Sequence, residues 1–110
     1  MISDNLFSLK GKTALVTGGS TGIGLMATVG LVSAGAKVFI VSRKLENCKN
    51  AAKELNNYGF EGKVIPFKGD LSSEAGINNI TDKIYSKNSK LHILINNAGR
   101  TWGSDLSSFP

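Results

Sequence analysis

The sequence lacks several features that would place it in particular protein classes. It has a single cysteine, Cys48, so no disulfide can form within the chain, which agrees with a reducing compartment. The longest apolar runs, at residues 38–41 and 93–95, are far too short to cross a bilayer. Residues 1–12 have neither the basic start nor the apolar stretch of a secretory signal. We therefore expect a cytoplasmic protein with no membrane partner.

Aromatic residues make up only 7% of the 110 residues, although the chain carries a formal net charge of +5. Its thirteen lysines and arginines are scattered, with no run of more than two, and aromatic residues do not alternate with them. A surface that binds nucleic acid would combine clustered basic residues with stacking rings. We therefore expect no nucleic acid among the partners, and interpret the charge as a solvated surface that favours anionic ligands.

What is present is typical of a folded domain, with 41% apolar and 19% charged residues. Three stretches of helical periodicity alternate with four short apolar runs, at residues 12–17, 37–41, 63–68 and 91–95. Such alternation favours a parallel sheet with right-handed crossovers. The third run contains Pro66, which cannot donate to a ladder and so belongs at a sheet edge. We predict an α/β fold: a Rossmann-like doubly wound parallel sheet, N-terminal half only, with strand order 3-2-1-4.

Each helical stretch has an apolar face that we expect to pack on this sheet. In the first, which Gly35 should cap, the predicted face comprises Ile23, Met26, Ala27, Gly30, Leu31 and Ala34. In the second it comprises Leu45, Cys48, Ala52 and Leu55; in the third, with Ser72 as N-cap, it comprises Ile77, Ile80 and Ile84. The fourth strand is apolar on both faces, yet no later element remains to cover it. We therefore expect an incomplete domain.

The elements are arranged around a glycine-rich turn, TGGSTGIG, at residues 17–24. A strand precedes this turn and a helix follows it, so unpaired N–H groups and the positive end of the helix dipole attract an anion there. Gly18 can take a positive φ, and Gly22 and Gly24 lack a Cβ, so a diphosphate can approach the backbone. The spacing is GxxxGxG, and no lysine follows the last glycine. This disfavours a loop that hydrolyses nucleoside triphosphates.

The glycine turn, the pair Asp70-Leu71 and NNAG at residues 96–99 together resemble the short-chain dehydrogenase/reductase family. The resemblance runs from about Leu9 to the end of the chain. Within the family, FSLKGKTALVTGGSTGIG and NNAGRTWG look most like the 3-oxoacyl-carrier-protein reductase branch, including its rhamnolipid-biosynthesis type. The resemblance implies that residues 1–110 are the N-terminal dinucleotide-binding part of one Rossmann-like domain.

The resemblance also implies roles for individual residues. The turn would line the cofactor diphosphate and the adenosine ribose, Asp70 would accept a hydrogen bond from adenine, and Asn96 would tie the fourth strand to the turn. Thr17 is expected to brace the turn through its hydroxyl instead of touching ligand. Asp70 as a simple turn cap and the asparagines as ordinary turn formers are the alternatives. The complete set of predicted cofactor-binding residues is Gly18, Ser20, Thr21, Gly22, Ile23, Gly24, Ser42, Arg43, Asp70, Leu71, Asn97, Ala98 and Gly99.

The end of the second strand predicts which cofactor is preferred. An enzyme that prefers NAD usually places a carboxylate there, which binds the ribose 2′-hydroxyl and repels a 2′-phosphate. Here Ser42 is followed by Arg43 and Lys44, and arginine presents a planar cationic fork that suits phosphate. We therefore predict NADP(H). The alternative is that Arg43 is only a solvated residue at a helix start.

No catalytic residue is predicted within the chain. The family uses a serine, a tyrosine and a lysine four residues after that tyrosine. The two tyrosines, Tyr58 and Tyr85, are followed at that distance by Gly62 and Ser89. His92 is more consistent with a packed or edge residue than with a base, Cys48 on an inner helix face is expected to be inert, and no metal site is predicted.

The resemblance implies the cofactor-binding part of an NADP(H)-dependent oxidoreductase that interconverts a carbonyl and an alcohol, such as a 3-oxoacyl thioester. The complete enzyme would take a small-molecule substrate and form a homo-oligomer, whereas this chain alone should be inactive. The first alternative is a non-catalytic nucleotide-binding or interaction module left by truncation. The second is a basic nucleic-acid binder, which salt-dependent retention on DNA or RNA without NADPH competition would indicate.

Overall fold

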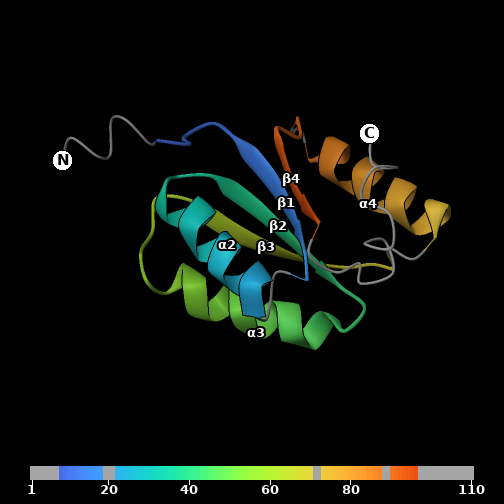
Figure 1. Ribbon diagram of the computed structural model, residues 1–110, viewed down its shortest axis with the longest axis horizontal. Coiled ribbons are helices and arrows are strands. Elements are labelled where there is room, and N and C mark those ends of the chain that lie inside the picture. Colours follow the sequence, from blue (N-terminus) through green and yellow to red (C-terminus); the bar gives the residue numbers. More distant parts are fainter. Residues whose placement is uncertain (1–7, 19–21, 71–72, 88–89, 97–110) are drawn as a thin grey trace.

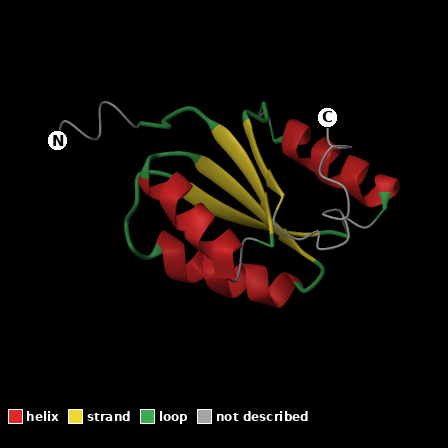
Figure 2. Cartoon of the chain, viewed as in Figure 1, coloured by secondary structure: helices red, strands yellow, loops and turns green. Residues whose placement is uncertain are grey.

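The computed structural model describes residues 8–18, 22–70, 73–87 and 90–96, which form one parallel sheet flanked by helices (Figures 1 and 2). The strands are β1 (Thr13–Thr17), β2 (Lys37–Ser42), β3 (Lys63–Lys68) and β4 (Ile93–Asn96). Their order across the sheet is β3-β2-β1-β4, and every neighbouring pair is parallel. The predicted fold class and strand order are therefore confirmed.

Helices cover both faces of the sheet. Figure 1 shows α2 (Gly22–Ser33) and α3 (Leu45–Asn56) on one face and α4 (Glu74–Ser86) on the other. Because successive strand residues point to opposite faces, the core divides into two clusters. Ala14, Val16, Val38 and Ile40 pack under α2 and α3, whereas Leu15, Phe39 and Val41 pack with Ile80 and Ile84 of α4. None of the described helices is long and apolar enough to span a membrane.

The positions of the strands follow from their composition. All five residues of β1 are buried, as expected for a strand with neighbours on both sides and apolar residues on both faces. β3 lies at an edge of the sheet, as Pro66 predicts, and the prediction is confirmed. β4 begins two residues later than predicted. Its Leu94 is 59% exposed, in agreement with the expectation that this strand is incompletely covered.

The predicted inner face of α2 is wrong in part: Leu31 packs against the core, but other members of that face are exposed. Ile23 and Met26 are 72% and 73% exposed, and the buried positions are instead Gly24, Thr28 and Val32. The segment GIGLMATVGLVS is apolar on nearly every side, so its periodicity does not select a face. The small side of the helix faces the sheet, and the buried Thr28 hydroxyl is satisfied because it donates to the Gly24 carbonyl at 2.8 Å.

The other helices agree better with the sequence. α3 buries Cys48, Ala52 and Leu55, and α4 buries Ile80 and Ile84, as their stripes predict. The predicted N-cap of α4 is wrong by one residue. Ser73, not Ser72, caps this helix, because its side chain accepts the Gly76 N–H at 3.0 Å.

Gly35 ends α2, as predicted, in a left-handed backbone conformation with φ +104°. Its N–H donates to the Val32 carbonyl and the Ala36 N–H to the Leu31 carbonyl, both at 3.1 Å. This pair of bonds is the Schellman arrangement, which satisfies carbonyls that the helix leaves unpaired.

Replacing Gly35 by alanine should lower the free energy of unfolding by about 1–3 kcal/mol, because an L residue is strained at this φ. The added Cβ would also lie 3.0 Å from Cγ of Lys10. Gly30→Ala is the matched control: nothing lies within 4 Å of its Cβ position, so better helix propensity should raise stability by about 0.5–1 kcal/mol. Urea denaturation measures the free energy of unfolding of both variants. Equal effects of the two substitutions would contradict this account of the cap.

Candidate functional site at the carboxyl edge of the sheet

The glycine turn leaves β1 at the carboxyl edge of the sheet, where all four parallel strands end. Gly18 has φ +64°, and its N–H donates to the Val41 carbonyl of β2 at 3.1 Å. Gly22, the first residue of α2, has φ +56°. Both conformations favour glycine, which explains why the turn needs these residues. Among the described residues, nothing lies within 4 Å of the position that a Gly22 Cβ would take, so there is open space on that side of Gly22.

Hydrogen bonds draw the ends of the strands together around this turn. The Gly69 N–H donates to the Ser42 carbonyl at 3.0 Å, which brings the end of β3, and Asp70 after it, to the end of β2. On the other side of β1, the Thr17 hydroxyl lies 3.0 Å from Oδ1 of Asn96 and donates to it. Asn96 thus ties β4 to the residue that opens the turn, as expected, whereas bracing of the turn itself by Thr17 stays a prediction.

The structure therefore brings part of the predicted site to one edge. Gly18, Ser42 and Asp70 stand at the ends of adjacent strands, Gly24 is buried in the first turn of α2, and Ile23 is exposed beside it. Six of the predicted residues lie outside the described ranges: Ser20, Thr21, Leu71, Asn97, Ala98 and Gly99.

The end of β2 carries positive charge toward solvent. Arg43 and Lys44 are both exposed, and no carboxylate stands between Ser42 and the start of α3. The Ser42 hydroxyl accepts the Lys44 N–H at 3.1 Å, which fixes the turn between β2 and α3. Glu46, in the first turn of α3, is the nearest acidic residue in the sequence. A dianionic group at this corner would meet a guanidinium and an ammonium group.

Gly76 is a supporting residue that sequence reasoning missed. A Cβ at this position would overlap the carbonyl oxygen of Asp70. The first turn of α4 can therefore approach the Asp70 backbone only with glycine there. An isolated glycine inside a helix lowers its stability by about 1 kcal/mol relative to alanine. A glycine at this position is therefore the signal in the sequence that another part of the backbone packs closely against the helix.

Of the remaining reactive side chains, His92 lies at the opposite edge, and Cys48 is buried next to Ser42. His92 stands at the amino ends of the strands, where its Nδ1 accepts the Thr13 N–H at 3.0 Å, so it is an edge residue. Burial raises the pKa of the Cys48 thiol, although a hydrogen bond with Ser42 opposes the shift, and a protonated thiol is a poor nucleophile. Within the described ranges, no three His, Cys, Asp or Glu side chains gather as metal ligands.

Replacing Thr17 by valine should lower the free energy of unfolding by about 0.5–1.5 kcal/mol, because it removes the hydroxyl bond to Asn96 without changing side-chain shape. Hydrogen exchange in β4 should quicken. Thr81→Val is the control, because the Thr81 hydroxyl donates only to the Ile77 carbonyl within α4, at 3.0 Å. If the two variants lose equal stability and β4 protection is unchanged, the link between β1 and β4 does not support the site.

Comparisons with known proteins agree with this geometry. A family model described as short chain dehydrogenase matches residues 12–110. The rhamnolipids biosynthesis 3-oxoacyl-[acyl-carrier-protein] reductase of Pseudomonas aeruginosa is 49% identical over 104 residues, which are 94% of this chain and 40% of that protein.

Two solved structures have the same arrangement of elements. The RhlG/NADP active-site complex of Pseudomonas aeruginosa is 47% identical, with a TM-score of 0.77, over 84% of this chain and 36% of that one. L-sorbose reductase from Gluconobacter frateurii, complexed with NADPH and L-sorbose, is 31% identical, with a TM-score of 0.77, over 84% of this chain and 35% of that one. The chain thus spans about two fifths or less of the length of these relatives.

Proposed function

The chain belongs to the short chain dehydrogenase family, and on this premise we propose that its carboxyl edge binds NADP(H). The observation that carries the proposal is the hydrogen bond from Gly18, at the start of the turn, to Val41 of β2, because Arg43 follows Val41 by two residues. The NADP and NADPH complexes of two similar proteins support it.

The residues present fit the diphosphate of this cofactor. The glycine turn leads into the start of α2, where N–H groups without partners in the helix and the helix dipole favour negative charge. The open space at the Gly22 backbone leaves room for phosphate oxygens to approach. Ile23 is exposed at the same helix start and can cover the ribose. We assign Ser20, Thr21, Gly22 and Gly24 to the same cradle.

The adenosine end is assigned to the ends of β2 and β3. Asp70 is exposed next to Ser42, where its carboxylate can accept a hydrogen bond from the adenine amino group. We assign the Leu71 backbone to the same ring, and Asn97, Ala98 and Gly99, after β4, to the nicotinamide side. Arg43 and Ser42 would hold the 2′-phosphate, which an acidic residue at this corner would repel.

NADP(H), when bound, supplies the hydride for interconversion of a carbonyl and an alcohol. The family acts on small molecules, and the reductase from Pseudomonas aeruginosa supports a 3-oxoacyl thioester as the substrate of the enzyme to which this chain corresponds. What the described residues do is bind and orient the cofactor, since none of them forms a catalytic group of the kind that the family uses. We further propose that the complete enzyme is a cytoplasmic homo-oligomer.

Arg43→Ala should weaken NADPH binding about tenfold or more, because it removes charge-assisted hydrogen bonds to the 2′-phosphate. NADH, which has no 2′-phosphate, should bind within about twofold of its original affinity. Calorimetric titration of the chain with each cofactor measures both constants.

Lys49→Ala is the matched control, because it removes one charge from an exposed position of α3 beyond the β2–α3 turn. It should leave both affinities nearly unchanged. Unaltered discrimination between NADPH and NADH in Arg43→Ala would refute the assignment of Arg43. Failure of the unmodified chain to bind either cofactor would refute the proposed function itself.

A further inference from the structure

The opposite edge of the sheet has a distinct chemistry. Every strand has a lysine at or just before its amino end: Lys12 precedes β1, Lys37 and Lys63 begin β2 and β3, and Lys90 stands three residues before β4. In the order of the sheet these residues run 63, 37, 12 and 90. Neighbouring strands lie about 4.8 Å apart, so the lysines form a row along one edge.

This row lines a cleft of about 830 Å³. Such a volume lies within the range of about 300–1,000 Å³ that small-molecule sites occupy. Besides the four lysines, its lining includes one carboxylate, Glu61, and two uncharged groups that can donate hydrogen bonds, Tyr85 and His92. The cleft lies at the amino ends of the strands and therefore at the opposite edge of the sheet from Gly18.

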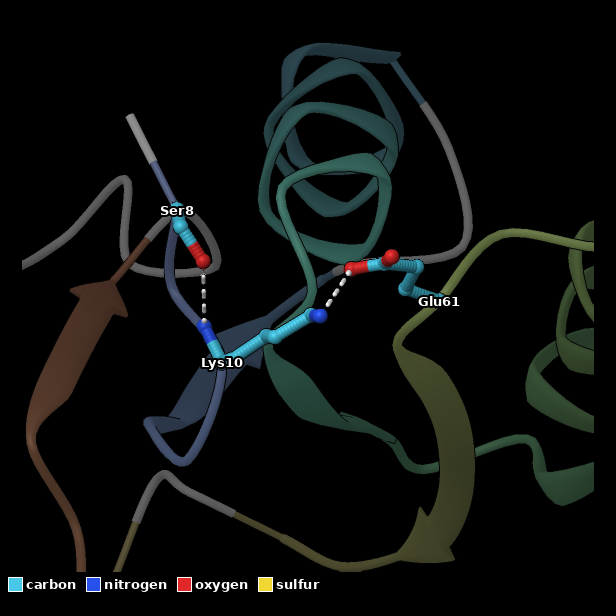
Figure 3. A network of polar contacts seen from close by, with 3 residues as sticks. All are labelled: Ser8, Lys10 and Glu61. Carbon is cyan, nitrogen blue, oxygen red and sulfur yellow. Dashed lines mark hydrogen bonds and ion pairs between the residues drawn. The ribbon is translucent and has the colours of Figure 1, made fainter. Parts of the chain in front are cut away.

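Glu61, the carboxylate in the lining, forms an ion pair with Lys10, which lies outside the lining. Lys10 Nζ lies 3.5 Å from Oε2 of Glu61 (Figure 3). This ion pair is at the surface, because the two side chains are 68% and 61% exposed. The Lys10 N–H also donates to the Ser8 hydroxyl at 3.3 Å. Lys10 thus offsets part of the charge of Glu61, and Lys12, Lys63 and Lys90 leave an excess of positive charge in the lining.

Two of the lysines are direct neighbours. Lys37 and Lys63 are register partners in the parallel pair β2–β3. Their side chains therefore leave the sheet on the same face, within reach of one anion. The Nδ1 of His92 accepts the Thr13 N–H, which leaves Nε2 as the ring atom that can donate to an anion.

We propose that this amino-edge cleft binds the diphosphate group of a phosphorylated small molecule. A single phosphate can bridge two neighbouring strands, whereas a diphosphate is long enough to meet the ammonium groups of three. The volume of the cleft fits a small molecule better than an extended nucleic acid. The site is separate from the proposed cofactor site and does not depend on it.

The test is a titration of the ¹⁵N-labelled chain with sodium pyrophosphate at constant ionic strength, followed by backbone amide shifts. Saturable shifts are expected at Thr13, Lys37 and Lys63. The double variant Lys63→Gln/Lys90→Gln should weaken this binding about tenfold or more, because it removes two ammonium groups from the row. A second double variant, Lys49→Gln/Lys53→Gln, makes the same charge change on α3 and should bind within about twofold of the original chain.

Equal affinity in the two double variants would overturn the proposal. So would shifts that sodium chloride reproduces, since these would show only ionic screening. Shifts confined to Gly18, Ser42 and Asp70 would place pyrophosphate at the carboxyl edge alone and would also overturn it. A single-stranded RNA oligomer that shifts the amino-edge amides where pyrophosphate does not would replace the proposed ligand by nucleic acid.

Discussion

The structure depends on the parallel pairing of β1 with both of its neighbours. All five residues of β1 are buried, and its register with β2 and β4 is continuous. Because the strands are parallel, every carboxyl end lies at one edge and every amino end at the other. The Gly18 turn, Ser42, Asp70 and Asn96 are distant in sequence, and this pairing is what makes them neighbours.

The two edges of the sheet consequently have different roles. At the carboxyl edge, backbone N–H groups, a helix start and Arg43 favour an anion. Hydrogen bonds between the strand ends hold these groups in place. At the amino edge the helices end, and the negative ends of their dipoles disfavour an anion, so the binding proposed there depends on the side-chain ammonium groups and hydrogen-bond donors of the cleft. The two anion sites that we propose therefore differ in geometry.

The sequence predicted the fold well where a residue has only one physically acceptable position. Pro66 can lie only on an edge strand, and the confined apolar stripe of α3 leaves one face to bury. It failed for α2, whose apolar residues surround the helix, and for Ser73, because adjacent serines are equivalent N-cap candidates. Sequence motifs predicted part of the site. The role of Gly76 could not be predicted, because it depends on where the Asp70 backbone lies, and no local sequence pattern encodes that position.

The central claim is that the carboxyl edge of this sheet is an NADP(H) site. Its most direct test is a titration of the ¹⁵N-labelled chain with NADPH, followed residue by residue. The account predicts saturable amide shifts at Gly18, Gly22, Ser42, Arg43 and Asp70, at the turn and the strand ends. Absence of saturable shifts at these residues, or shifts confined to the lysine row of the amino edge, would contradict it.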